Sequence, residues 1–149
     1  MDLNYFCHVL DSEKNRHAVM YINSCEFKKK FIKDEENYKK VVAHLVFCFE
    51  KALQIAKDKF GKETIMVFLN LKKAKMKNFS AKFMKDIIHL FEHQYPDRLQ
   101  NCVILNPSFI IKIIYKILYP IIDKDTRKKF VWEKNGKIKS IDIDNDFNF

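Results

Sequence analysis

Two short, continuous apolar runs constrain the fold of this chain more than any other feature. They are TIMVFLNL at 64–71 and CVIL at 102–105. Runs of this length with β-branched members are typical of strands buried on both faces of a parallel sheet. Between them, Ser80 can cap a helix that Pro96 forces to end. This alternation indicates right-handed crossovers, so we predict an α/β fold with a mainly parallel sheet and helices packed on it.

The flanking segments supply the other elements of this fold. YFCHVLD at 5–11 and HAVMYIN at 17–23 surround a polar turn and predict an antiparallel hairpin. A long helix should run from Asp34 to a stop at Gly61. A second hairpin is predicted around the Asn-Gly pair at 135–136. The apolar face of the long helix is expected at Val42, Leu45, Val46, Phe49 and Leu53.

Size, charge and cysteine content limit the class of protein. The chain has 149 residues with two glycines and three prolines, which leaves little room for linkers and predicts a single domain, 1–149. A net charge of +9 favours anionic partners, either phospholipid surfaces or nucleic acid. The four cysteines lack metal-like spacing, and the amino terminus does not resemble a signal peptide, so we expect reduced thiols and a cytoplasmic protein.

The most apolar helix of the chain lies between two prolines, at 107–119. At 100° per residue, Ser108, Lys112 and Lys116 fall within a stripe of about 80°, and the remaining circumference is apolar. That is more apolar surface than one core face needs. Such a helix is either sandwiched between protein layers or covers something apolar that is not protein, such as a lipid chain or a membrane. Periodicity alone leaves both interpretations open.

Several motifs, taken together, resemble the CRAL-TRIO lipid-binding domain. YPDRL at 95–99, CVILNP at 102–107, the apolar helix and YPIIDKDTRKKF at 119–130 follow the family's order: Tyr-Pro-Glu-Arg, a strand ending in Asn-Ala-Pro, an apolar helix and Thr-x-x-Lys. DSEKNRHAVMYI and MVFLNLKKAKMKNFS extend the resemblance upstream, so that it covers 6–133 best. The family's amino-terminal helical bundle has no counterpart, from which we expect a smaller or more open pocket.

The resemblance implies a sheet floor, helical walls and an apolar gate helix around one lipid. The inositol phosphate would be held by Asp97, Thr126 and Lys129, which match the acid of the first motif and the Thr and Lys of the last. Lys112 and Lys116 would dock on an anionic membrane. The gate-helix residues expected to contact acyl chains are Phe109, Ile110, Ile111, Ile113, Ile114, Ile117 and Leu118.

A metalloprotease-like H-x-x-E-H pattern occurs at His89, Glu92 and His93. Both histidines share a helix face with Lys82 and Asp86, away from the apolar stripe, and no further pattern supplies a third ligand. We therefore interpret them as surface histidines and expect no metal site.

The sequence favours a non-enzymatic protein that binds and transfers, or senses, a phospholipid. Phosphatidylinositol or a phosphoinositide is the expected ligand, no other cofactor is expected, and contact with membranes should be peripheral and transient. A homodimer could cover apolar surface that the missing bundle leaves exposed. Two alternatives stay open: a degenerate lipid domain with a filled pocket that binds other proteins, and a basic nucleic-acid-binding protein, which the absence of any base-reading motif disfavours.

Overall fold

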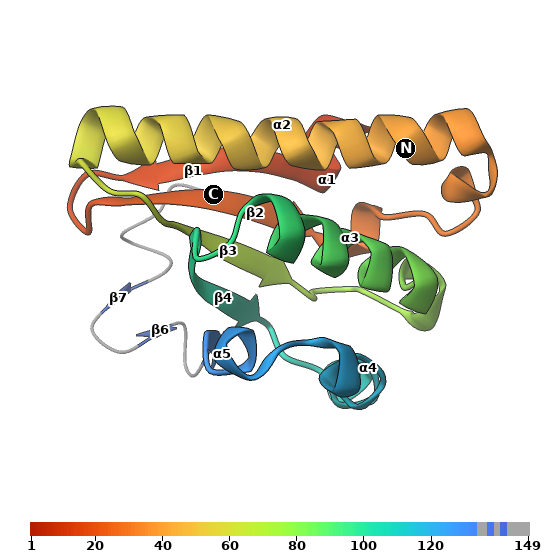
Figure 1. Cartoon of the computed structure of the whole chain (residues 1–149). Coiled ribbons are helices and arrows are strands. Elements are labelled where there is room, and N and C mark those ends of the chain that lie inside the picture. The colour runs from red at the N-terminus through yellow and green to blue at the C-terminus, as the bar shows by residue number, and fades with distance from the viewer. Residues whose placement is uncertain (134–136, 139–140, 143–149) are drawn as a thin grey trace.

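The computed structural model describes residues 1–133, 137–138 and 141–142, and its centre is a five-stranded sheet (Figure 1). The strand order is β1-β2-β3-β4-β5, with β1 antiparallel to β2 and the remaining neighbours parallel. The predicted α/β class and amino-terminal hairpin are thus confirmed. The strands are β1 (Cys7–Ser12), β2 (His17–Asn23), β3 (Ile65–Asn70), β4 (Leu99–Leu105) and β5 (Phe130–Trp132).

Helices connect the parallel strands in chain order. Because β2 to β5 are added one beside the next in the same direction, right-handed crossovers place every connecting helix on the same face of the sheet. The crossover helices are α2 (Glu35–Phe60), α3 (Ala81–Gln94) and α4 (Phe109–Leu118). Shorter elements are α1 (Leu3–Phe6), α5 (Lys124–Arg127) and four single turns, η1 (Ser24–Glu26), η2 (Phe31–Lys33), η3 (Met76–Asn78) and η4 (Tyr119–Ile121).

The predicted helix boundaries are confirmed by their capping geometry. Asp34 Oδ1 accepts hydrogen bonds from the backbone N–H groups of Glu36 and Asn37, at 2.8 and 3.1 Å, and so begins α2. Gly61 ends it in the left-handed conformation at φ +61°, where its N–H donates to the Lys57 carbonyl. Ser80 Oγ caps α3 in the same way by accepting from the Phe83 N–H.

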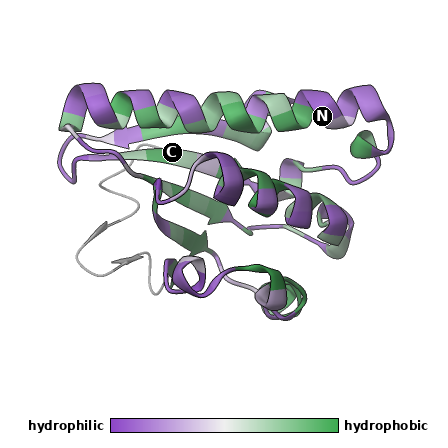
Figure 2. Ribbon diagram, in the orientation of Figure 1, coloured by the Kyte–Doolittle hydropathy of each residue, from purple (hydrophilic) through white to green (hydrophobic). Residues whose placement is uncertain are grey.

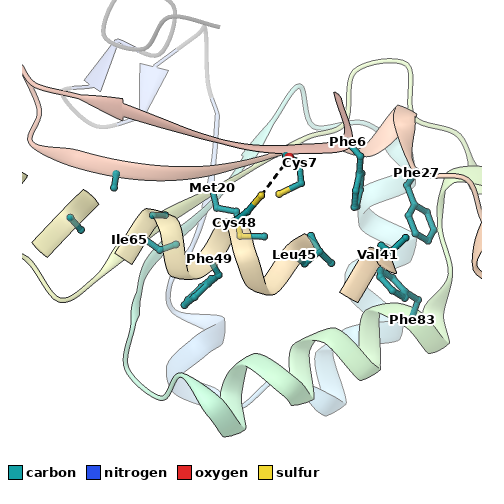
Figure 3. Close-up of a cluster of buried hydrophobic side chains, with 13 residues drawn as sticks. Phe6, Cys7, Met20, Phe27, Val41, Leu45, Cys48, Phe49, Ile65 and Phe83 are labelled. Carbon is teal, nitrogen blue, oxygen red and sulfur yellow. Dashed lines mark hydrogen bonds between the residues drawn. The ribbon is translucent and has the colours of Figure 1, made fainter. Parts of the chain in front are cut away.

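The buried face of α2 differs from the predicted one, because small residues rather than Val42 and Leu53 lie at its centre. Ala52 and Ala56 are completely buried, and their small side chains let the helix approach β1 and β2 closely. Val42 and Leu53 lie at the edge of this face and are half-buried. Figure 3 shows the contact: Cys48 points toward β1, and its Sγ lies 3.6 Å from the Cys7 carbonyl oxygen. Phe49 points instead toward α3, where its ring centroid lies 4.7 Å from that of Phe91.

The second predicted hairpin is wrong in its pairing. β5 runs parallel to β4, with Cys102 opposite Phe130 and Ile104 opposite Trp132. β6 (Lys137–Ile138) pairs instead with β7 (Ile141–Asp142). The crossover through α4 delivers the chain to the open edge of β4, where Val131 packs on the apolar cluster around Phe68 and Val103. The expected Asn-Gly turn at 135–136 lies outside the described residues.

Hydrophobic residues predominate on the strands and on α4, and they alternate with hydrophilic residues along α2 and α3 (Figure 2). Three clusters result: one between α2 and the sheet, one on the opposite face of the sheet, and one joining β4 to α3 and α4. Among the described residues, no helix is both long enough and apolar enough to cross a bilayer.

Candidate functional site

A cavity of about 550 Å³ opens between the sheet and the helices α3 and α4. This volume falls within the range of about 300–1,000 Å³ typical of small-molecule sites. The cavity contradicts the alternative of a domain whose pocket is filled by large side chains. Its floor is the helix-covered face of the sheet, at Met20, Ile22, Val67, Leu69, Cys102 and Ile104.

The walls of the cavity that α3 and α4 form are mainly apolar. α3 contributes the stripe from Phe83 to Phe91, in which Ile87 and Ile88 are half-buried although they belong to the interior of the fold. Val67 and Leu69 of the floor are likewise half-buried, whereas Met66 and Phe68 on the other face of β3 are nearly inaccessible. The accessible apolar surface is therefore on the side where the helices stand over the sheet.

α4 forms one side of this cavity and has apolar residues on two faces. Ile111, Ile114 and Leu118 line the cavity and are at most 8% exposed. The other four residues predicted to contact acyl chains do not line it, because successive residues of a helix turn by 100° and only one face can point inward. Ile110 is half-buried, and the exposed ones are Phe109, Ile113 and Ile117.

The outer face of α4 combines this exposed apolar surface with two lysines. Lys112 and Lys116 are exposed and form no ion pair within the part of the chain that the structure describes. Tyr119 and Ile121 of the following turn are also exposed. The outer side of α4 and the turn after it thus carry exposed apolar and basic residues.

The three residues predicted to hold a head group all line this same cavity. Asp97 lies in the turn between α3 and β4, exposed and with φ +60°. Lys129 is fixed beside β4, because its carbonyl accepts from the Cys102 N–H at 2.9 Å and from Asn101 Nδ2 at 3.3 Å. No described carboxylate lies within salt-bridge distance of its ammonium group.

Thr126 reaches the cavity from α5, but its hydroxyl proton is already used. Asp123 caps α5 by accepting from the Thr126 N–H at 2.9 Å, and its second oxygen accepts from Thr126 Oγ1 at 2.8 Å. These two hydrogen bonds lower the pKa of Asp123 below its usual value. Thr126 therefore offers lone pairs to the cavity rather than a donor.

Glu92 is a further polar residue of the cavity that the sequence analysis did not assign to it. Its Oε1 atom is buried and has no hydrogen-bond partner among the described residues. Burial raises the pKa of Glu92; the Asp123 carboxylate raises it further, while the Asp123 backbone N–H and the Thr126 hydroxyl act in the opposite direction. The signal was present in the sequence, because Met84, Ile88 and Glu92 follow at intervals of four and share one helix stripe.

The two histidines of the H-x-x-E-H pattern face outward, as predicted. His89 and His93 are exposed, and their rings stack with centroids 5.4 Å apart. Among the described residues, no group of three His, Cys, Asp or Glu side chains is placed to hold a metal ion. The pattern therefore does not form a zinc site of the usual kind.

Comparison with known families gives a match over nearly the whole chain. The family model described as "CRAL/TRIO domain" matches residues 3–147. The chain belongs to the CRAL/TRIO family. CRAL/TRIO domains are in general binding modules for lipids and other small lipophilic molecules, and the cavity described above has the apolar lining that such ligands need.

Known relatives agree with this CRAL/TRIO assignment. The chain is 28% identical over 89 residues to a "CRAL-TRIO domain-containing protein" of Schizosaccharomyces pombe, covering 59% of this chain and 9% of that protein. It is 25% identical over 129 residues to Patellin-6 of Arabidopsis thaliana, covering 83% and 32%. The crystal structure of Sfh5 superposes with a TM-score of 0.73 at 20% identity, covering 93% of this chain and 54% of Sfh5. The chain thus spans about half or less of the length of these relatives.

Proposed function

We propose that this chain is a cytoplasmic, non-enzymatic carrier that binds one phospholipid, phosphatidylinositol or a phosphoinositide, and transfers it between membranes. One observation supports this most directly: Asp97, Thr126 and Lys129 line one cavity that also has a large apolar lining on the sheet, α3 and α4. A lipid has the same division, with hydrocarbon at one end and a polar head at the other. Binding of such a lipid in this cavity would involve no covalent step.

Burial of the acyl chain provides the driving force for binding. Each methylene group that leaves water contributes about 0.8 kcal/mol. Lys129 supplies a cation for the lipid phosphate, since its ammonium group has no described carboxylate partner. The carboxylate of Asp97 can accept hydrogen bonds from hydroxyl groups of the head.

Contact with the membrane is assigned to the outer face of α4. Phe109, at 76% exposed, and Ile113 can enter the interface between head groups and acyl chains. Lys112 and Lys116 would each add about 1 kcal/mol of attraction to an anionic surface. Because Ile111 and Ile114 on the inner face line the cavity, movement of this one helix would open the site at the membrane.

The head-group assignment is tested by a transfer assay with matched lysine variants. Labelled phosphatidylinositol is moved from donor to acceptor vesicles by the wild type, by Lys129→Ala and by Lys128→Ala. Lys128 is exposed and does not line the cavity, so it controls for loss of one positive charge. We expect transfer to fall about tenfold in Lys129→Ala only. Equal transfer by both variants would refute the assignment, and absence of transfer by the wild type would refute the carrier function.

The docking surface is tested by charge reversal on α4. The double variant Lys112→Glu and Lys116→Glu should lose binding to anionic vesicles, with less effect at high salt because screening already weakens the attraction. The control is the double variant Lys51→Glu and Lys57→Glu, which makes the same charge change on exposed residues of α2. α2 and α4 lie at opposite ends of the layer of helices that covers the sheet (Figure 1). Equal loss in both double variants would show that only net charge matters.

A further inference from the structure

The polar end of the cavity contains more hydrogen-bond acceptors than donors. Glu92 Oε1 is buried and forms no hydrogen bond of normal geometry among the described residues, although the Asp123 N–H and the Thr126 hydroxyl are near enough to oppose the rise in its pKa. The Thr126 proton itself goes to Asp123. Asp97 adds a carboxylate that the described residues do not neutralise by an ion pair. A buried acceptor without a donor is unfavourable, so a ligand that brings hydroxyl donors to this end is favoured.

The charges at this end are opposite in sign to those of the chain as a whole. The lining contains four carboxylates and two ammonium groups, although the net charge of the chain is +9. The nearby guanidinium of Arg127 does not line the cavity; it lies over the Tyr119 ring, 4.0 Å from its centroid, and Nε donates to the Ile122 carbonyl. The ionic lining residues are Glu92, Asp97, Asp123, Lys124, Asp125 and Lys129.

This arrangement discriminates between uncharged and phosphorylated head groups. One phosphodiester can be placed at Lys129, whose ammonium group has no described carboxylate within salt-bridge distance. A phosphate monoester on the ring would add a charge of about −1.5 to −2. Beside Glu92 and Asp123 that charge would meet like charges, whereas a ring hydroxyl in the same place would donate hydrogen bonds to them.

We propose that Glu92 is a specificity-determining residue, whose half-buried carboxyl group accepts hydrogen bonds from head-group hydroxyls and excludes head groups that carry additional phosphates. The chain would then select phosphatidylinositol with an unphosphorylated ring over phosphoinositides. This inference rests on the proposed lipid-binding function and narrows it to a neutral polyol head. Glu92 acts by direct contact with the ligand.

The experiment compares two soluble short-chain lipids, dioctanoyl phosphatidylinositol and dioctanoyl phosphatidylinositol 4-phosphate, by calorimetry with the full chain. We expect the wild type to bind the unphosphorylated lipid at least about tenfold more tightly. Glu92→Gln keeps the shape but removes the charge and adds donors, so it should weaken phosphatidylinositol binding about tenfold and bring the ratio of the two Kd values close to one. Glu13→Gln, on the exposed β1–β2 turn, makes the same charge change away from the cavity and should keep the wild-type ratio.

The outcomes separate this inference from the function on which it rests. If the wild type binds phosphatidylinositol and Glu92→Gln keeps the wild-type ratio, the role of Glu92 is wrong while the carrier function stands. If the wild type binds neither lipid, both proposals fail. Thermal unfolding checks that Glu92→Gln is still folded. The variant should unfold at the same temperature as the wild type or a higher one, because burial disfavours the charged carboxylate. A changed ratio of Kd values in a folded variant is then not explained by loss of folding.

Discussion

Filling the cavity from its floor should weaken lipid binding without weakening the fold. Val67 lies on β3, half-buried, with its side chain in the lining of the cavity. Val67→Phe adds about four carbon atoms that occupy space otherwise available to the ligand. At about 0.8 kcal/mol per methylene group the loss is about 3 kcal/mol, or roughly a hundredfold in Kd. The free protein should be at least as stable as the wild type, because the ring fills empty apolar space.

The assay for this prediction has two readouts and a matched control. Titration with a short-chain phospholipid gives Kd, and urea unfolding of the lipid-free chain gives the free energy of unfolding. Val9→Phe places the same substitution in a strand, at a half-buried site outside the cavity. It should bind lipid like the wild type. Unchanged affinity in Val67→Phe would refute the position of the ligand, and equal weakening in both variants would show a general loss of structure.

Two further predictions concern the fold. Tyr38→Phe removes a 2.6 Å hydrogen bond from the Tyr38 hydroxyl to Asp86 Oδ2, which joins α2 to α3 and lowers the pKa of Asp86, and should cost about 1.5 kcal/mol at pH 7. The pKa of Asp86 is lower in the folded chain than in the unfolded chain, so this stabilisation is present above the unfolded pKa, about 4, and disappears as the pH falls through the folded pKa. Urea unfolding should therefore show a smaller difference in unfolding free energy between wild type and Tyr38→Phe at pH 3 than at pH 7. An equal difference at the two pH values would contradict this prediction. Gly61→Ala should cost about 1 kcal/mol from φ +61° alone, since an added Cβ meets open space, and an unchanged unfolding midpoint would contradict that strain.

Local chemical signals made much of the fold predictable. Asp34, Gly61 and Ser80 act on backbone groups within one turn of themselves, so the ends of α2 and α3 follow from the sequence. The pairing of β5 was not predictable in this way, because residues 130–132 pair with residues of β4 that lie 25 or more positions earlier in the sequence. The Asn-Gly pair predicted that this strand would pair with the segment directly after it, whereas the strand pairs with β4.

The candidate site was also predictable only in part. The motifs that resemble the family identified Asp97, Thr126 and Lys129, and the fold brings all three to one cavity. Their hydrogen-bonding states could not be predicted, because the use of the Thr126 proton by Asp123 depends on side-chain geometry. The volume of the cavity depends on how far α3 and α4 stand from the sheet, and residue types alone do not determine that distance.

The most direct test of the central claim is native mass spectrometry of the chain after incubation with phospholipid vesicles and re-isolation. The account predicts a complex of one chain with one lipid, with phosphatidylinositol enriched over its share in the vesicles. It also predicts less bound lipid for Val67→Phe. A folded wild-type chain that keeps its bare mass at every vesicle concentration would contradict the account.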